Sequence, residues 1–194
     1  MPPIQTKYDL QPRTCLRPER HSPHRHTVSS NFTLEDRIAH LRWVESELAR
    51  CQNQGGLQIA LVKKAHEVFK EFGKTVTFAV MFNQTTVVIH TPDPANPKNI
   101  GIYCANYLPE NLPHGEILSR AEREQAIIHK QEGNDEFLAL PFAIKGTQII
   151  WGLMLLSNQT SQKAFTPDDI EIARLFTQIA TNALTDYKHR QALS

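Results

Sequence analysis

Two short apolar runs follow one another in the last third of the chain. They cover residues 137–144 and 149–156, and Lys145 and Gly146 separate them. Short apolar runs on either side of a turn signal predict two adjacent strands. A polar stretch follows, and residues 166–187 then repeat apolar positions at helical spacing. The C-terminal third therefore predicts a strand pair that leads into a long amphipathic helix.

The first ordered residues predict two helices. Thr33 is an N-cap residue followed by acidic residues. A leucine then recurs every seven residues in a heptad-like stripe formed by Leu34, Leu41 and Leu48. Residues 53–56 include two glycines and predict the end of this helix, because glycine tolerates a left-handed cap. A second helix is expected at residues 57–72, and Gly73 closes it.

Alternating positions predict strands in the middle of the chain. Residues 75–82 alternate in polarity, residues 85–90 form the hairpin partner, and a third strand is expected at residues 99–105. Proline-rich loops flank the third strand, and residues 115–131 predict a polar helix with a modest apolar side. Consecutive strands with short turns make an antiparallel sheet, and helices must cover a face of it. The predicted fold class is therefore α+β.

Residues 1–31 differ from the rest of the chain. They are rich in proline, arginine and histidine and contain almost nothing to bury. Such a segment cannot offset its ordering entropy, so we expect a disordered tail before a domain at residues 32–194. The tail could instead be a basic arm for an acidic partner, or a metal site built from His21, His24, His26 and Cys15. A flexible tail holds ligands poorly, which favours the solvated tail over the metal site.

Composition narrows the class of protein. The formal net charge is +1, from 21 basic and 20 acidic residues, so no overall field recruits nucleic acid or a membrane. The cysteines Cys15, Cys51 and Cys104 are odd in number and lack metal-like spacing, which suits a reducing compartment. No apolar segment approaches the roughly 18–20 residues that span a bilayer, and the N-terminus lacks the apolar core of a signal peptide. We expect a cytoplasmic protein that binds neither nucleic acid nor a membrane.

Three motifs resemble the C-terminal part of GAF domains, a family of small sensory modules. In that family an apolar-Pro-apolar step usually ends the penultimate strand, a glycine interrupts the aliphatic last strand, and an aromatic residue precedes a capped acidic helix start. The corresponding motifs are Leu140-Pro141-Phe142, Ile150-Trp151-Gly152-Leu153 and Phe165-Thr166-Pro167-Asp168-Asp169. The match covers about residues 137–187, and residues 57–90 fit by order and length. The resemblance implies a GAF-like central antiparallel sheet, with long N- and C-terminal helices on one face and a loop and helix cap on the other.

The ligand motifs of several GAF branches are absent. The sequence has no Asn-Lys-Phe-Asp-Glu set, which cyclic-nucleotide-binding members carry. Cys104 is followed by Ala105, whereas bilin-binding relatives place histidine or leucine beside the attachment cysteine. The methionine-sulfoxide reductase branch needs several cysteines around its pocket. The resemblance therefore implies a sensory module and leaves its cofactor unknown.

Candidates for catalytic chemistry are few. We find no Ser-His-Asp order, paired-carboxylate pattern or phosphate-cradling glycine loop. Cys104 is either a pocket thiol or a small buried residue on a central strand, and the second is commoner for an unpaired cysteine. His66 and His90 are expected to be core or boundary residues rather than catalytic bases. Alternation places Trp151 in the core against the helices, on one face with Ile149, Leu153 and Leu155.

We expect a non-catalytic sensory or regulatory module that binds a small molecule or a signalling protein and signals through its terminal helices. A ligand under the excursion at residues 91–131 would favour one arrangement of those helices. The expected pocket-lining residues are strand positions near the excursion: Phe78, Ile102, Cys104, Leu140 and Phe142. The alternatives are a small redox or hydrolytic enzyme with Cys104 as nucleophile, and a structural adaptor without a ligand.

The terminal helices carry more apolar surface than one sheet contact requires. The band on the last helix consists of Ile172, Leu175, Phe176, Ile179, Ala180, Ala183, Leu184 and Tyr187. This band and the heptad stripe could form a four-helix bundle between two chains, or both could cover the chain's own sheet. We expect the homodimer, because the helix at residues 57–72 already supplies a sheet-covering face.

Overall fold

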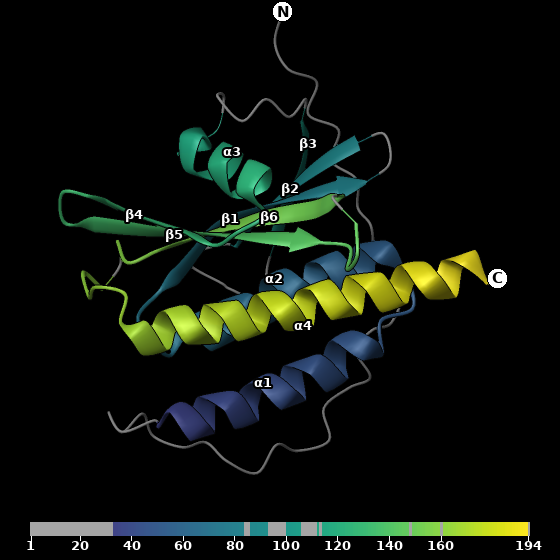
Figure 1. Ribbon diagram of the computed structural model, residues 1–194, viewed down its shortest axis with the longest axis horizontal. Coiled ribbons are helices and arrows are strands. Elements are labelled where there is room, and N and C mark those ends of the chain that lie inside the picture. Colours follow the sequence, from purple (N-terminus) through teal and green to yellow (C-terminus); the bar gives the residue numbers. More distant parts are fainter. Residues whose placement is uncertain are drawn as a thin grey trace, which may run out of the picture.

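The computed structural model describes residues 33–83, 86–92, 100–105, 112, 114–147, 149–159 and 161–193. The predicted disordered tail at residues 1–31 lies outside these ranges, and so do its candidate metal ligands. Both predictions therefore stay untested. The described residues form a sheet with helices on its two faces (Figure 1).

The described strands form one six-stranded antiparallel sheet in the order β3-β2-β1-β6-β5-β4. In chain order the strands are β1 (Thr75–Asn83), β2 (Thr86–Pro92), β3 (Ile100–Ala105), β4 (Ile128–Glu132), β5 (Asp135–Ala143) and β6 (Ile150–Ser157). The two apolar runs of the sequence become β5 and β6, which pair directly. Both strands are buried along most of their length because helices cover both faces of the sheet at this point.

The helices lie on the two sides of the sheet in unequal numbers. Helices α2 (Gln54–Lys70) and α4 (Pro167–Ala192) cover one face, and α3 (Gly115–Glu124) covers the other (Figure 1). Helix α1 (Leu34–Ala49) packs on α4 and α2 and forms an outer layer (Figure 1). The predicted α+β fold, with the terminal helices on one side and a cap on the other, is confirmed.

The starts of both terminal helices follow from local sequence. Thr33 accepts a hydrogen bond from the Asp36 N–H, and the Asp36 carboxylate accepts one from the Thr33 N–H. Thr166 and Asp169 form the same reciprocal capping box at α4, with Pro167 in the first turn. The predicted caps at Thr33 and Thr166 are therefore confirmed.

Two predicted element boundaries are wrong. The glycines at residues 55 and 56 do not end α1, because the Asn53 side chain caps α2 and accepts the Gly56 N–H at 2.7 Å. The helix predicted at residues 115–131 ends at Glu124, where Gln125 has a positive φ of 50°. Residues Ile128–Glu132 instead form edge strand β4, which pairs with β5.

The sheet separates two apolar cores. The α2/α4 core includes Leu138, Leu140, Phe142, Met154 and Leu156 together with side chains of α1, α2 and α4. The α3 core consists of Val80, Ile117, Leu118, Ala121, Ile128, Phe137, Ala139, Leu153 and Leu155. Because successive strand residues point to opposite faces, β5 and β6 contribute to both cores.

The prediction that Trp151 shares a face with Leu153 and Leu155 is wrong. Phe142 pairs with Gly152 and Ala143 pairs with Ile150, so Trp151 is an extra residue in a β-bulge. The bulge shifts the alternation and places Trp151 in the α2/α4 core, where its ring lies 6.5 Å from that of Tyr187. The expectation that Trp151 packs against the helices is confirmed.

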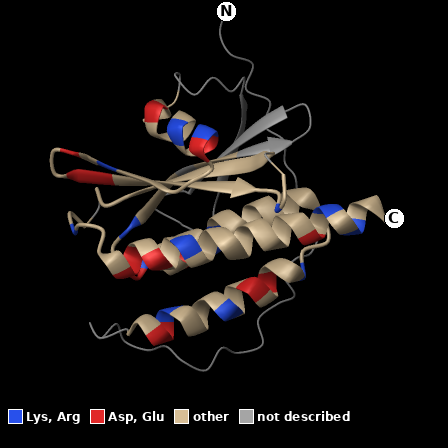
Figure 2. Cartoon of the chain, in the orientation of Figure 1, with Lys and Arg blue, Asp and Glu red and all other residues tan. Residues whose placement is uncertain are grey.

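Charged residues avoid the middle of the sheet. They lie on α1, α2 and α3, near the ends of α4 and on the β4–β5 hairpin, whereas β1 and β6 contain none (Figure 2). Among the residues that the structure describes, no helix has the length and apolarity needed to cross a membrane.

Candidate functional site

The five predicted pocket residues do not gather beneath α3. Leu140 and Phe142 are fully buried in the α2/α4 core, on the opposite face of the sheet. The strand register places Ile102 in one cross-strand row with Leu140, and Cys104 in the neighbouring row with Phe142. Phe78 pairs with a residue of the α3 core. Ile102, Cys104, Leu140 and Phe142 therefore lie in two neighbouring cross-strand rows. That any of the five residues contacts a ligand stays a prediction.

Helix α3 covers the opposite face of the sheet over β4, β5 and β6. Its apolar side chains contribute to the α3 core, and left-handed residues bound it at both ends, with φ 57° at His114 and 50° at Gln125. The His114 ring lies 3.8 Å from the Phe137 ring, and Lys130 Nζ lies 3.2 Å from a Glu116 carboxylate oxygen. Left-handed conformations of non-glycine residues cost of order 1–3 kcal/mol each. Helix α3 is therefore a short cover whose two ends are held in an unfavourable backbone conformation.

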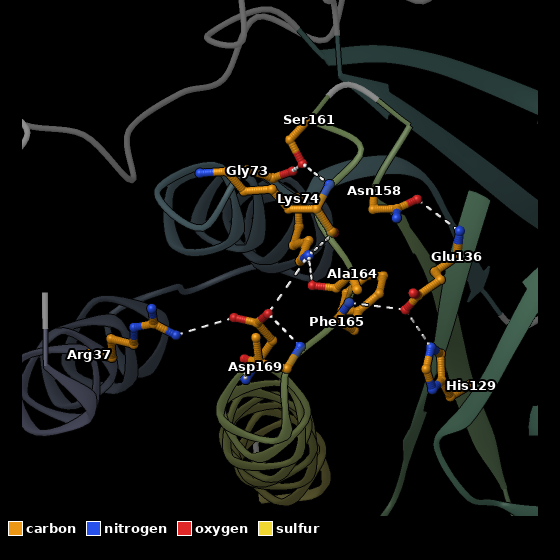
Figure 3. A network of polar contacts seen from close by, with 12 residues as sticks. Arg37, Gly73, Lys74, His129, Glu136, Asn158, Ser161, Ala164, Phe165 and Asp169 are labelled. Carbon is orange, nitrogen blue, oxygen red and sulfur yellow. Dashed lines mark hydrogen bonds and ion pairs between the residues drawn. The ribbon is translucent and has the colours of Figure 1, made fainter. Parts of the chain in front are cut away.

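A buried lysine joins the start of β1 to the start of α4 (Figure 3). The Lys74 side chain is 1% exposed, and its Nζ donates to the carbonyl oxygens of Lys163 and, at 2.7 Å, Ala164. The same Nζ lies 3.7 Å from Asp169 Oδ2 and 4.4 Å from the centre of the Phe165 ring. Burial lowers the pKa of Lys74, although the carboxylates of Asp169 and Glu136 oppose that shift.

Asp169 connects this lysine to α1. Its Oδ1 accepts a hydrogen bond from Arg37 Nη1 at 3.2 Å, and its Oδ2 accepts the Thr166 N–H at 2.9 Å (Figure 3). The Arg37 guanidinium also lies 3.9 Å from the centre of the Phe72 ring. A single carboxylate therefore caps α4 and holds α1 against it.

Glu136 connects the same junction to the β4–β5 hairpin. Its Oε2 accepts the Phe165 N–H at 2.9 Å and lies 2.9 Å from His129 Nε2 on β4 (Figure 3). Burial alone would raise the pKa of Glu136, but the Phe165 and His129 contacts and the charge of Lys74 lower it overall. Asn158 accepts the Glu136 N–H at 2.7 Å.

We call the set of Arg37, Lys74, His129, Glu136 and Asp169 the junction network. It links α1, the start of β1, the β4–β5 hairpin and α4, which are far apart in sequence. Its carboxylates are paired with cations and backbone donors, which suits mechanical linkage better than proton transfer to a substrate. In the described part of the chain no three His, Cys, Asp or Glu residues are grouped to hold a metal ion.

Gly73 is required where the junction network begins. Its φ is +70°, and an added Cβ would lie 2.8 Å from the Ser161 Cβ, whose hydroxyl donates to the Gly73 carbonyl. Replacing Gly73 by alanine is expected to lower the free energy of unfolding by about 2–3 kcal/mol, because a left-handed penalty adds to a clash. Urea unfolding of Gly146→Ala is the control, since that glycine also has a positive φ but an added Cβ meets nothing within 4 Å. Equal losses in the two variants would show that the Ser161 contact is unimportant.

Helix α2 carries buried polar atoms that lack hydrogen-bond partners. Both ring nitrogens of His66 and Nε2 of Gln58 are buried, and none has a partner among the described residues. Burial, with a smaller contribution from Lys70, lowers the pKa of His66 below 6.5. His66 is thus a boundary residue of the core, as predicted, rather than part of a polar site.

The lowered pKa of His66 predicts acid sensitivity. Between its folded pKa and 6.5 the unfolded chain binds more protons at this residue, so the free energy of unfolding falls as the pH drops through that window. The slope of stability against pH, measured by urea unfolding, should be smaller in His66→Leu than in the wild type. The exposed His189 at the end of α4 supplies the control variant His189→Leu. Identical slopes in the wild type and His66→Leu would contradict the prediction.

The apolar stripes of α1 and α4 face each other within one chain. Leu41, Val44 and Leu48 are buried against the other helices. The predicted homodimer stays a prediction, and a second chain would have to use the surface that remains. Part of that surface is a groove of about 200 Å³ between α1 and α4, which we call the α1/α4 groove. It is lined by Ile38, Leu41, Arg42, Glu45, Leu175, Gln178, Ile179 and Asn182.

No local pattern in the sequence marks the central residue of the junction network. A single lysine before a strand is usually solvated, so Lys74 was not predicted as a buried group. Asp169 was identified as a helix-start residue, and that role is confirmed. Its pairing with Arg37, 132 positions away, depends on tertiary structure.

Two solved structures with a similar fold are described as a GAF sensor protein and a GAF domain. A protein of Burkholderia vietnamiensis described as a GAF sensor superposes with a TM-score of 0.57 at 8% identity, over 85% of this chain and 99% of that chain. The GAF domain of an Acinetobacter phosphoenolpyruvate-protein phosphotransferase superposes with a TM-score of 0.50 at 10% identity, over 81% and 95% of the two chains. No family model and no curated protein matches the sequence. The chain therefore has a GAF-like fold, which confirms the resemblance at the level of architecture.

Proposed function

We propose that this chain is a non-catalytic regulatory module that binds a small molecule or a partner protein on the α3 side of its sheet and signals through α1 and α4. The observation that carries the proposal is the shared use of β5 and β6 by the two cores. Phe137 and Ala139 belong to the α3 core, whereas Leu138 and Leu140 belong to the α2/α4 core. Displacement of α3 would therefore change the strand on which α4 packs. The cysteine usage supports a cytoplasmic setting.

The contacts of the junction network also support signalling from the α3 side of the sheet to α1 and α4. His129 on β4 contacts Glu136 on β5, and Glu136 holds the backbone just before α4. Asp169 in the first turn of α4 then holds Arg37 of α1. A ligand with different affinities for two positions of α3 would shift the populations of two α1–α4 arrangements.

Thermal unfolding of the full chain with a panel of nucleotides, amino acids and tetrapyrroles tests the proposal. A specific ligand at a hundred times its dissociation constant should add about 2.7 kcal/mol to the free energy of unfolding. Hydrogen exchange should then change in α3 and also in α1 and the start of α4.

Substitution of Lys130, which pairs with Glu116 of α3, tests whether the ligand binds on the α3 side of the sheet. Lys130→Met removes the ion pairs with Glu116 and Glu132 and should alter the apparent affinity for the ligand. Arg174→Met is the matched control, because it removes an exposed ion pair with Glu171 on α4. A ligand whose affinity responds to neither variant, or whose exchange effect stays outside α1 and α4, would rule the proposal out.

A further inference from the structure

Two pairs of histidine and glutamate lie on opposite faces of the β4–β5 hairpin. On one face, His114 Nδ1 lies 3.4 Å from Glu132 Oε2. On the other face, His129 Nε2 lies 2.9 Å from Glu136 Oε2. Because His129 pairs with Leu138 of the α2/α4 core, the residues that alternate with it along β4 face α3, and Glu132 is one of them. The hairpin therefore presents one titratable pair to each layer of helices.

The pair on the α3 side holds the start of α3. His114 directly precedes this helix, and its ring lies 3.8 Å from the Phe137 ring on β5. Glu132 also lies 2.9 Å from Lys130 Nζ, and Lys130 pairs in turn with Glu116 of α3 at 3.2 Å. The hydrogen bond from Lys130 lowers the pKa of Glu132 most, and the charge of His114 lowers it further. The charged groups around His114 are therefore Glu132, Lys130 and Glu116.

The pair on the other side acts on the start of α4. Glu136 is buried, and its Oε2 also accepts the N–H of Phe165, two residues before α4 (Figure 3). Lys74 is a further charged group that acts on Glu136, and it also faces Asp169 of α4. His129 is exposed, so it exchanges its proton with water. A change in the charge of His129 therefore acts on the carboxylate that holds the backbone before α4.

We propose that the β4–β5 hairpin is a pH-sensitive switch, in which protonation of His114 and His129 tightens the contacts of the hairpin with α3 and with the segment before α4. Histidine changes its charge between about pH 5 and about pH 8. A protonated imidazole attracts a carboxylate through its charge as well as its N–H, whereas a neutral imidazole offers the hydrogen bond alone. The added attraction is present at low pH and is lost as the pH rises, because the closed form is favoured only while the histidine holds the proton.

This inference rests on the proposed function, because it places the route from α3 to α4 under the control of pH. At low pH the hairpin holds both helices, so a ligand that displaces α3 must work against both pairs. At high pH both pairs are weaker, and the same ligand shifts a larger fraction of the chains to the second arrangement. The pH then sets how strongly the module responds to its ligand.

Hydrogen exchange of the full chain without ligand, at about pH 5 and about pH 8, tests the switch. The exchange rates are corrected for the intrinsic pH dependence of amide exchange. The protection of α3 should be about threefold higher at the lower pH, within the range for partly exposed ion pairs. The protection of the Phe165 amide should be about tenfold higher, because the carboxylate of Glu136 is buried. Both changes are local and opposite in sign to the effect of His66 on global unfolding.

Glutamine variants of the two histidines keep a polar side chain without its titration. His114→Gln should remove the pH response of α3, and His129→Gln should remove that of the Phe165 amide. Glu132→Gln removes the exposed partner carboxylate on the α3 side and should act as His114→Gln does. The control is Glu122→Gln, because burial raises the pKa of Glu122 on α3 and its titration is a separate source of pH dependence. The response of α3 should persist in this control.

Three outcomes would overturn the inference. The first is equal protection of the wild type at the two pH values. The second is a pH response that survives in both histidine variants while their circular dichroism matches that of the wild type. The third is a response of α3 that disappears in Glu122→Gln.

The pH switch and the proposed function fail in different ways. A pH response that behaves as expected in the variants, in a chain that binds nothing in the thermal panel, would leave the switch standing without its signalling role. A ligand that changes exchange in α3 and α4 equally at both pH values would leave the proposed function standing and overturn the switch.

Discussion

Replacing Lys74 with methionine is expected to lower the free energy of unfolding by about 3 kcal/mol, at the low end of the range for breaking a buried ion pair. The substitution leaves two backbone carbonyls without their donor and removes a positive charge beside Asp169 and Glu136. The loss stays near the low end because Arg37 and the Thr166 N–H still contact Asp169. Burial of the ammonium also costs energy, as its lowered pKa shows, and this cost disappears with the lysine.

Urea unfolding of the full chain measures this effect, with Lys145→Met in the exposed turn between β5 and β6 as the control. The double variant Lys74→Met/Asp169→Asn should cost less than the sum of the two single variants by about 0.5–3 kcal/mol, the usual range for residues in contact. A Lys74→Met variant as stable as the wild type would mean that desolvation of the ammonium cancels all of its bonds. The junction network could not then act as a rigid link between the sheet and α4.

Local sequence predicted the last third of the chain well because its signals are local. The turn between β5 and β6 and the capping box at Thr166 depend on residues within a few positions of each other. The edge strand β4 was missed because its residues include lysine, glutamine and glutamate, which are good helix formers that continue the pattern of α3. Pairing with β5 overrides that propensity, and such pairing has no local signature.

The candidate pocket was harder to predict because it depends on which face each strand residue occupies. β-Bulges break the alternation in both strands that flank the centre of the sheet, at Thr77 in β1 and at Trp151 in β6. Each bulge moves the following residues to the other face relative to simple alternation. The prediction of Leu140 and Phe142 as pocket residues depends on strand positions near the excursion at residues 91–131 and not on the face that each residue occupies. The structure places them on the face away from α3.

Substitution of Phe142 is expected to have the second large effect on the free energy of unfolding. The result also distinguishes a core role for Phe142 from the predicted role in a ligand pocket. Its side chain has no exposed surface, and its ring lies 6.5 Å from Phe176, which in turn lies 5.6 Å from Phe69. Phe142→Ala removes most of a buried aromatic side chain between β5 and two helices, so the free energy of unfolding should fall by about 3–5 kcal/mol. Phe142→Leu retains much of the volume and should cost clearly less.

Urea unfolding of both variants, followed by ligand titration of Phe142→Leu, gives the measurement. A core residue should change stability without changing the affinity of any ligand found in the thermal panel, because the α3 core is on the other side of the sheet. Phe137→Leu on the α3 face is the matched variant, since Phe137 belongs to the same strand and is equally buried. It should alter ligand affinity as well as stability. The opposite result, with affinity sensitive to Phe142 and insensitive to Phe137, would place the binding site between the sheet and α2/α4, in the rows that contain Ile102 and Cys104.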